Sequence, residues 1–218
     1  MPSPELLEKI LIVAFLILSL GIHEAAHAWV ADLCGDSTAK NLGRMTLNPI
    51  VHIDLFMTIL LPAILLMSGS GFLFGGAKPV PVNPHNLRKP LRDMMFVAIA
   101  GPLSNVMLAV VFMFIFRILV FQVGMDSNAL APKVMYASMY VNLILAIFNM
   151  LPVPPLDGSR VMAYVLPSSL REQYVGLERF GMIIVFALLF SGVLSTVLRA
   201  TILPMVRFVQ ILTGGIWS

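Results

Sequence analysis

The residues best suited to chemistry are His23, Glu24 and His27, which form an H-E-A-A-H run at the end of an apolar stretch. Histidines four residues apart lie about 40° apart around a helix axis, so both imidazoles can reach one metal ion. The intervening glutamate faces the same region and can act as a base on a water that the metal activates. The run therefore predicts a metal site with hydrolytic chemistry.

The helix that carries this run is hydrophobic enough to lie in a bilayer. The chain is 59% hydrophobic and only 11% charged, whereas soluble domains carry about 25% charged residues. Ionisable side chains are costly inside a membrane and by default mark functional sites. The net charge of +3 fits lysines and arginines in cytoplasmic loops better than nucleic-acid binding. We therefore expect an integral membrane protein without a nucleic-acid partner.

Hydropathy predicts the order of the elements. Membrane spans are expected at about residues 6–31, 93–121, 134–150 and 180–197. The pattern leaves open whether the apolar stretches 53–68 and 199–213 also cross. A short helix is expected at 157–167, and Ser169 with Glu172 forms a capping-box signature for the next one.

These elements predict an all-α polytopic membrane protein that forms a single domain over residues 1–218. Three transmembrane helices are expected to carry the metal site, with a re-entrant or β-like segment at 53–85 and one or two C-terminal membrane helices. The basic cluster Arg88, Lys89 and Arg92 should be cytoplasmic. The next span then runs outward and the following span returns, which brings Asp157 to the cytoplasmic side.

Asp157 is the best candidate for a third metal ligand. Catalytic zinc sites usually have three protein ligands and an open position for water. Asp157 follows a predicted span and a proline-rich turn, and Gly158 permits close backbone approach. A competing interpretation makes Asp157 a helix N-cap, although capping and ligation can coexist. We expect one Zn²⁺ per chain.

Several motifs together carry a family resemblance. They are His23-Glu24-Ala-Ala-His27, Gly101-Pro102-Leu-Ser-Asn105, Asn149-x-x-Pro152 and Leu156-Asp157-Gly158, with Asn48-Pro49, His52-Ile-Asp54 and Gly76-Ala-Lys-Pro-Val-Pro-Val-Asn83 as further matches. The chain resembles the site-2 protease family of intramembrane zinc metalloproteases, in a small form without a PDZ or CBS domain. It departs from the pattern at Leu55 and Met57, which leaves the role of His52 open.

The resemblance implies zinc held by His23, His27 and Asp157, with Glu24 as general base. It implies hydrolysis of peptide bonds within or near transmembrane segments of membrane proteins. From the alternation of spans we expect a protein of the cell membrane with its active site toward the cytoplasmic side. Asn105 or Asn149 is a candidate to stabilise the oxyanion. The substrate, the regulatory pathway and the oligomeric state are not readable from the sequence.

Residues 77–82 suggest how an unwound substrate is held. Pro79 and Pro81 lack amide donors on one edge of an extended strand, whereas Lys78, Val80 and Val82 keep theirs on the other. The pattern predicts strand addition by the substrate on that second edge.

Two other classes compete with a site-2 protease. A metal-transporting or metal-sensing membrane protein also places His and Asp on spans, but transport needs no acid beside the first ligand. A prenyl-protein endopeptidase would usually take its third ligand from another Glu or His.

Overall fold

The structure is a computed structural model that describes residues 3–54 and 76–215. Its helices, in chain order, are α1 (Pro4–Leu33), α2 (Thr38–Asn41), η1 (Pro49–His52), η3 (Pro84–Asn86), α4 (Pro90–Arg117), η4 (Ile118–Gln122), α5 (Leu130–Asn149), α6 (Asp157–Val165), α7 (Ser168–Gly176), η5 (Leu177–Phe180), α8 (Gly181–Phe190) and α9 (Val193–Leu212). The η4 segment is a π-helix, and the other η segments are short 3₁₀ turns. The described residues contain no strand.

Five helical stretches are long and apolar enough to cross a membrane. They are α1, α4 continued by η4, α5, the stretch from α7 through α8, and α9. This confirms the prediction of an all-helical polytopic membrane protein. The predicted helix at 157–167 is also confirmed, as α6.

The predicted boundary between the last two spans is wrong. Instead of 180–197 and 199–213, the structure has spans at Ser168–Phe190 and Val193–Leu212. The reason is Gly192, which adopts a left-handed φ of 76° and ends the helical path between α8 and α9. Hydropathy stays high on both sides of this glycine, so the hydropathy pattern gave no signal for the break. The predicted capping box is wrong as well, because α7 begins at Ser168 after Pro167 and Ser169 lies within its first turn.

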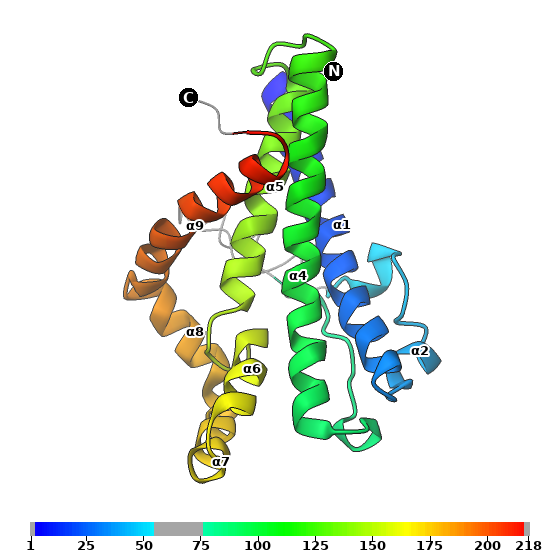
Figure 1. Ribbon diagram of the computed structural model, residues 1–218, viewed down its shortest axis with the longest axis vertical. Coiled ribbons are helices and arrows are strands. Elements are labelled where there is room, and N and C mark those ends of the chain that lie inside the picture. Colours follow the sequence, from blue (N-terminus) through cyan, green and yellow to red (C-terminus); the bar gives the residue numbers. More distant parts are fainter. Residues whose placement is uncertain (1–2, 55–75, 216–218) are drawn as a thin grey trace.

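The helices α1, α4 and α5 run side by side and form the centre of the molecule (Figure 1). Apolar side chains from α4 and α5 pack together and are covered by one face of α9. The buried members of this core are Ala109, Phe112, Met113, Phe116, Met139, Leu143, Ile202, Val206 and Val209. Ser3 caps the N-terminus of α1, because its side chain accepts a hydrogen bond from the amide of Leu6.

The two ends of the bundle carry different parts of the chain. The C-terminal end of α1, the start of α4 and α6 lie in the lower half of Figure 1, whereas the N-terminus and the connection between η4 and α5 lie at the top. The structure therefore places Asp157 and the end of α1 at the same end of the bundle, as the alternation of spans predicted.

An extended segment, residues 77–82, is tied to α1 and to the residues that follow it. The amide of Lys78 donates to the carbonyl of His52 at 2.8 Å, and Arg44 donates to the carbonyl of Lys78 at 2.8 Å. The described part of the predicted re-entrant or β-like segment 53–85 thus has no strand partner and ends in the 3₁₀ turn η3. Residues 55–75 of that prediction lie outside the described residues.

Asp36 anchors the far end of the extended segment. This fully buried carboxylate accepts hydrogen bonds from the amide of Asn83 at 2.7 Å and from the side chain of Asn86 at 2.9 Å. Burial alone would raise the pKa of Asp36, but the hydrogen bonds donated by Thr38, Asn86 and Asn83 lower it overall. The ionised carboxylate therefore fixes residues 83–86 beside the end of α1.

Candidate metal centre

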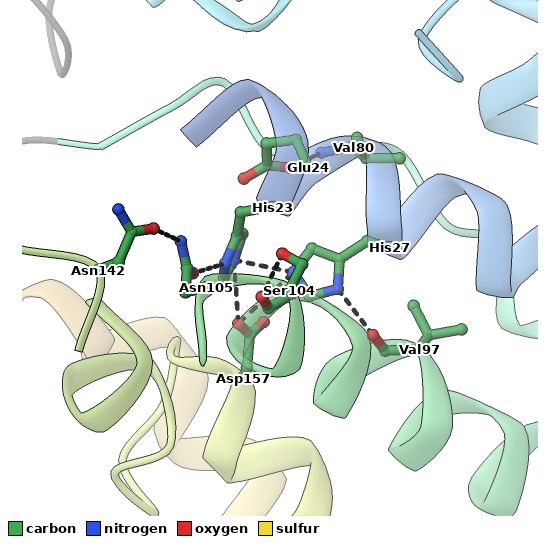
Figure 2. A network of polar contacts seen from close by, with 10 residues as sticks. His23, Glu24, His27, Val80, Val97, Ser104, Asn105, Asn142 and Asp157 are labelled. Atoms are coloured by element: carbon green, nitrogen blue, oxygen red, sulfur yellow. Dashed lines mark hydrogen bonds and ion pairs between the residues drawn. The ribbon is translucent and has the colours of Figure 1, made fainter. Parts of the chain in front are cut away.

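Three potential ligand atoms converge between α1 and α6 (Figure 2). The Nε2 atoms of His23 and His27 are 3.0 Å apart, and Oδ2 of Asp157 lies 3.3 Å from the first and 3.4 Å from the second. Ligands about 2.0–2.1 Å from a zinc ion in a tetrahedron are separated by about 3.3–3.4 Å. Among the described residues, His23, His27 and Asp157 are the cluster of His, Cys, Asp and Glu side chains that could hold a metal ion.

The hydrogen bonds on the outer side of each imidazole show why a cation fits. Nδ1 of His27 lies 2.7 Å from the carbonyl oxygen of Val97, which can only accept, so Nδ1 must carry the proton. Nδ1 of His23 lies 2.6 Å from Oδ1 of Asn105, which also accepts. When the two rings are neutral, their Nε2 atoms therefore present lone pairs, and they face Oδ2 of Asp157, a buried atom without a hydrogen-bond donor. Three acceptors at this distance repel one another unless a cation lies between them.

Gly101 on α4 makes the space that the two imidazoles occupy. A β-carbon at this position would lie 2.6 Å from Cε1 of His23 and still closer to Nε2 of His27. Glycine therefore lets α4 approach α1 closely enough for the carbonyl of Val97 and the side chain of Asn105 to reach the imidazoles. The Gly101-Pro102 motif thus has a direct geometric role at the metal centre.

Asp157 reaches the histidines because α6 starts directly beneath the end of α5. A β-carbon at Gly158 would lie 2.5 Å from the carbonyl oxygen of Leu151 and closer still to that of Met150. Asp157 is the first residue of α6, and Leu156 occupies the N-cap position. The carboxylate faces the imidazoles, and no side-chain capping bond is made at this terminus. Of the two interpretations of Asp157, the geometry favours ligation.

Glu24 lines the same pocket, which has a volume of about 330 Å³ and is bordered by α1, α4, α6 and the extended segment. Its carboxylate accepts a hydrogen bond from the backbone amide of Val80, with an N–Oε2 distance of 2.8 Å. Figure 2 shows Glu24 turned toward Val80, while the two histidines turn toward Asp157. The predicted base therefore lies beside the metal group and already holds a polar partner.

The structure distributes the other candidate residues over three places. Asn149, Val80 and Val82 line the pocket. Lys78 is exposed, and its backbone amide and carbonyl bond His52 and Arg44. His52 is buried away from the metal group, with Nε2 3.0 Å from the carbonyl oxygen of Thr46.

Asn105 does not fit the role of an oxyanion stabiliser. Its side chain is completely buried, and its oxygen and nitrogen bond His23 and Asn142 respectively. Its nitrogen already donates to Asn142, and the side chain lies behind the His23 ring as seen from Asp157 (Figure 2). Asn149, which borders the pocket, remains the candidate for that role.

Sequence reasoning missed Asn142, Ser19 and Asp36. Asn142 and Ser19 continue the hydrogen bonds behind Asn105, and Asp36 anchors the extended segment. The signal available for the first two was their polarity within apolar spans, which is costly unless the groups find partners. Asp36 lies in a polar loop, so nothing in the sequence separated it from its neighbours.

The arrangement supports hydrolysis of a carbonyl compound. His23, His27 and Asp157 would hold a divalent metal, which when bound would supply Lewis acidity toward water and the carbonyl group. The Glu24 carboxylate lies in the pocket where it can accept a proton from the attacking water and deliver it to a leaving amine. His23, Glu24 and His27 are buried, and such a setting strengthens these electrostatic effects.

Comparison with known proteins agrees with this chemistry. The sequence model described as "Peptidase family M50" matches residues 11–130 and 118–192. The chain is 40% identical over 191 residues to "Putative zinc metalloprotease YwhC" of Bacillus subtilis, covering 86% of this chain and 83% of that protein. It is 27% identical over 186 residues to "Putative zinc metalloprotease Rip2" of Mycolicibacterium smegmatis, covering 85% and 69% respectively.

A shorter match is 43% identical over 68 residues to "Putative zinc metalloprotease MJ0611" of Methanocaldococcus jannaschii, covering 31% of this chain and 32% of that protein. No solved structure matches the chain. The family match spans most of the chain and includes all three converging ligands. The chain therefore belongs to peptidase family M50, the site-2 protease family, and is a zinc metalloprotease.

Proposed function

We propose that this protein is an intramembrane endopeptidase that cuts transmembrane or membrane-proximal segments of other membrane proteins. The observation that carries this proposal is the position of the metal group. His23, His27 and Glu24 lie on α1, one of five stretches able to cross a membrane, and open into a pocket bordered by a second such helix. A substrate that approaches between spans reaches the ligands without leaving the bilayer.

The extended segment provides a means to hold an unwound substrate. Helical substrates hide their peptide bonds in internal hydrogen bonds, so cleavage requires a stretch of exposed backbone. Val80 and Val82 border the pocket from a segment that makes no helix. In an extended strand the amides of Lys78, Val80 and Val82 share one edge, and on this edge Lys78 already donates to His52 and Val80 to Glu24. Strand addition at Val80 therefore requires Glu24 to release the amide as the substrate enters.

Replacing Val80 with proline is expected to lower the rate of substrate cleavage by roughly tenfold or more, because it removes the amide that would pair with the entering substrate. Zinc content should stay at the wild-type level, since Val80 is not part of the metal group. Cleavage rate and zinc content of the purified protein are the two measurements. Val80→Ala, which keeps the amide, is the matched control. Equal cleavage rates for Val80→Pro and Val80→Ala would contradict a role of the Val80 amide in holding the substrate.

The orientation in the membrane follows from the charges near α4. Arg88 and Lys89 precede this helix, whose start lies at the same end of the bundle as α6, the helix that begins with Asp157 (Figure 1). Clusters of Lys and Arg next to a span favour the cytoplasmic side. We therefore place the active site toward the cytoplasm of the cell membrane.

Thiol labelling in vesicles tests this orientation. Cys34 is the chain's single cysteine, so Cys34→Ser gives a background without thiols. His85→Cys and Asn128→Cys then put one exposed thiol at either end of the bundle. A membrane-impermeant reagent should label His85→Cys in inside-out vesicles and Asn128→Cys in right-side-out vesicles. The reverse pattern would place the active site toward the outside.

Intramembrane cleavage itself is tested in cells that contain either the wild-type protein or Glu24→Gln. Peptides from membrane proteins are compared by quantitative mass spectrometry. New chain ends within or next to apolar spans should appear only with the wild-type protein, and uncut precursors should accumulate with the variant. Differences confined to soluble proteins would contradict the proposal and leave a metalloprotease of another specificity.

A further inference from the structure

A row of buried polar groups runs from His23 into the centre of the bundle. It contains Asn105 on α4, Asn142 on α5 and Ser19 on α1, each with no exposed surface. Asn105 Nδ2 donates to Asn142 Oδ1 at 3.0 Å, and Asn142 Nδ2 donates to Ser19 Oγ at 2.9 Å. Figure 2 shows the first part of this row behind the His23 ring. The row crosses all three central helices, and none of its members behind His23 is a metal ligand.

The direction of these hydrogen bonds is fixed at the deep end. Asn142 Nδ2 also lies 2.9 Å from the backbone carbonyl oxygen of Ser138, which can only accept. The amide nitrogen of Asn142 must therefore face Ser138, and its oxygen must face Asn105. This oxygen in turn requires the amide nitrogen of Asn105, which leaves the Asn105 oxygen toward His23. An inverted Asn105 would force an inverted Asn142, whose oxygen would then meet the Ser138 carbonyl.

The same logic decides which nitrogen of His23 carries the proton. Because Asn105 presents an oxygen, Nδ1 of His23 must donate, and Nε2 keeps the lone pair that faces Asp157. His27 needs no such row, since its Nδ1 bonds the carbonyl of Val97 directly. Outer partners of this kind usually fix the tautomer and orientation of a metal-binding histidine.

We propose that Asn142 is a positioning residue that sets the tautomer of His23 through Asn105 and so prepares the metal site before zinc arrives. The Ser138 carbonyl orients His23 indirectly, through the side-chain amides of Asn142 and Asn105. His27 instead bonds a backbone carbonyl directly. This inference rests on the zinc site and not on the proposal that substrates are transmembrane.

Asn142→Ala is the direct test, with Ser138→Ala as matched control. Ser138 lies one turn earlier on α5, and its buried hydroxyl has no hydrogen-bond partner. Its removal deletes a buried polar group but keeps the backbone carbonyl. Asn142→Ala should weaken zinc binding roughly tenfold to a hundredfold, measured by competition with a chelator of known affinity. Ser138→Ala should bind zinc as the wild-type protein does.

A second readout follows the tautomer itself. In the metal-free protein with ¹⁵N-labelled histidine, at a pH where the rings are neutral, His23 should give the Nδ1–H pattern alone. Its signals are assigned by their loss in His23→Gln. Asn142→Ala should give a mixture of both tautomers for His23 and leave His27 unchanged. A protein that is merely loosened would not change one ring selectively.

Asn142→Asp keeps the proposal testable if the alanine variant folds poorly. The new carboxyl group, neutral in this apolar setting, can donate to the Ser138 carbonyl and still present an oxygen to Asn105. It should restore the Nδ1–H tautomer and most of the zinc affinity. Wild-type zinc affinity in Asn142→Ala, or equal weakening by Ser138→Ala, would overturn the proposal. So would a pure Nδ1–H signal in an Asn142→Ala protein that binds zinc weakly.

Discussion

Glu24→Gln should lower the rate of peptide hydrolysis by roughly 10²–10⁴-fold, because general acid–base catalysis contributes about this factor. The amide of glutamine has the same shape as the carboxylate but cannot accept a proton at neutral pH. Its oxygen can still accept the hydrogen bond from Val80, so the pocket should keep its form. Zinc content should remain near that of the wild-type protein, since Glu24 is not in the metal group. Turnover and metal content of the purified protein are measured side by side.

Glu5→Gln is the matched control for this change. It makes the same chemical substitution on the same helix, at a side chain that is 77% exposed and pairs only with Lys9 among the described contacts. It should leave both turnover and metal content unchanged. A Glu24→Gln protein with undiminished turnover would exclude Glu24 as the base. Loss of zinc from this variant would instead indicate that Glu24 supports the metal site.

Asp157→Ala should have the second large effect, on zinc binding itself. Removal of an outer partner usually costs 10–100-fold in affinity, so loss of a direct ligand should cost roughly a hundredfold or more. The two imidazoles would also lose the carboxylate that balances the charge of the cation. Hydrolysis should fall below detection at ordinary zinc concentrations. Chelator competition measures the affinity, and turnover at increasing zinc concentration shows whether any activity returns.

Two variants make this result specific. Asp157→Asn keeps the size of the side chain but removes its negative charge, and we expect weak binding between the two extremes. Asp126→Ala removes an exposed aspartate in the connection at the opposite end of the bundle and should change neither binding nor turnover. Tight zinc binding by Asp157→Ala would point to a different third ligand, as in the prenyl-protein endopeptidase alternative.

The metal ligands were predictable because two kinds of local information were enough. The spacing of His23 and His27 sets their direction on one helix. The alternation of spans, read from Arg88, Lys89 and Arg92, brings Asp157 to the same end of the bundle. Neither argument needs the packing of side chains between helices. The structure agrees with both in the positions of these three ligands.

The partners of the ligands were not predictable in the same way. Whether Asn105 faces the substrate or the back of His23 depends on how α4 rotates against α1, and Gly101 sets that contact at the level of a single methyl group. Asn142 gains its role only after α4 and α5 are packed together. A short sequence motif does not specify how one helix is rotated against another. The motif therefore could not show that Asn105 faces the back of His23, where it does not fit the predicted oxyanion role.

Some helix ends could also be predicted from the sequence, and others could not. The proline-rich turn before Asp157 predicted the end of α5, because proline cannot continue a helix. The break at Gly192 lies within a continuous apolar stretch, where hydropathy has no contrast. The bonds of Lys78 and Val80 depend on contacts with residues 26 and 56 positions earlier in the chain. The extended shape was foreseeable from the prolines, but the identity of its partners was not.

The distance along the chain between His27 and Asp157 has a consequence for biosynthesis. A nascent polypeptide that has emerged only as far as α5 offers two imidazoles and lacks the carboxylate that completes the set. Hydrolytic competence therefore arises late in translation, after the third central helix has been inserted and the following turn has folded.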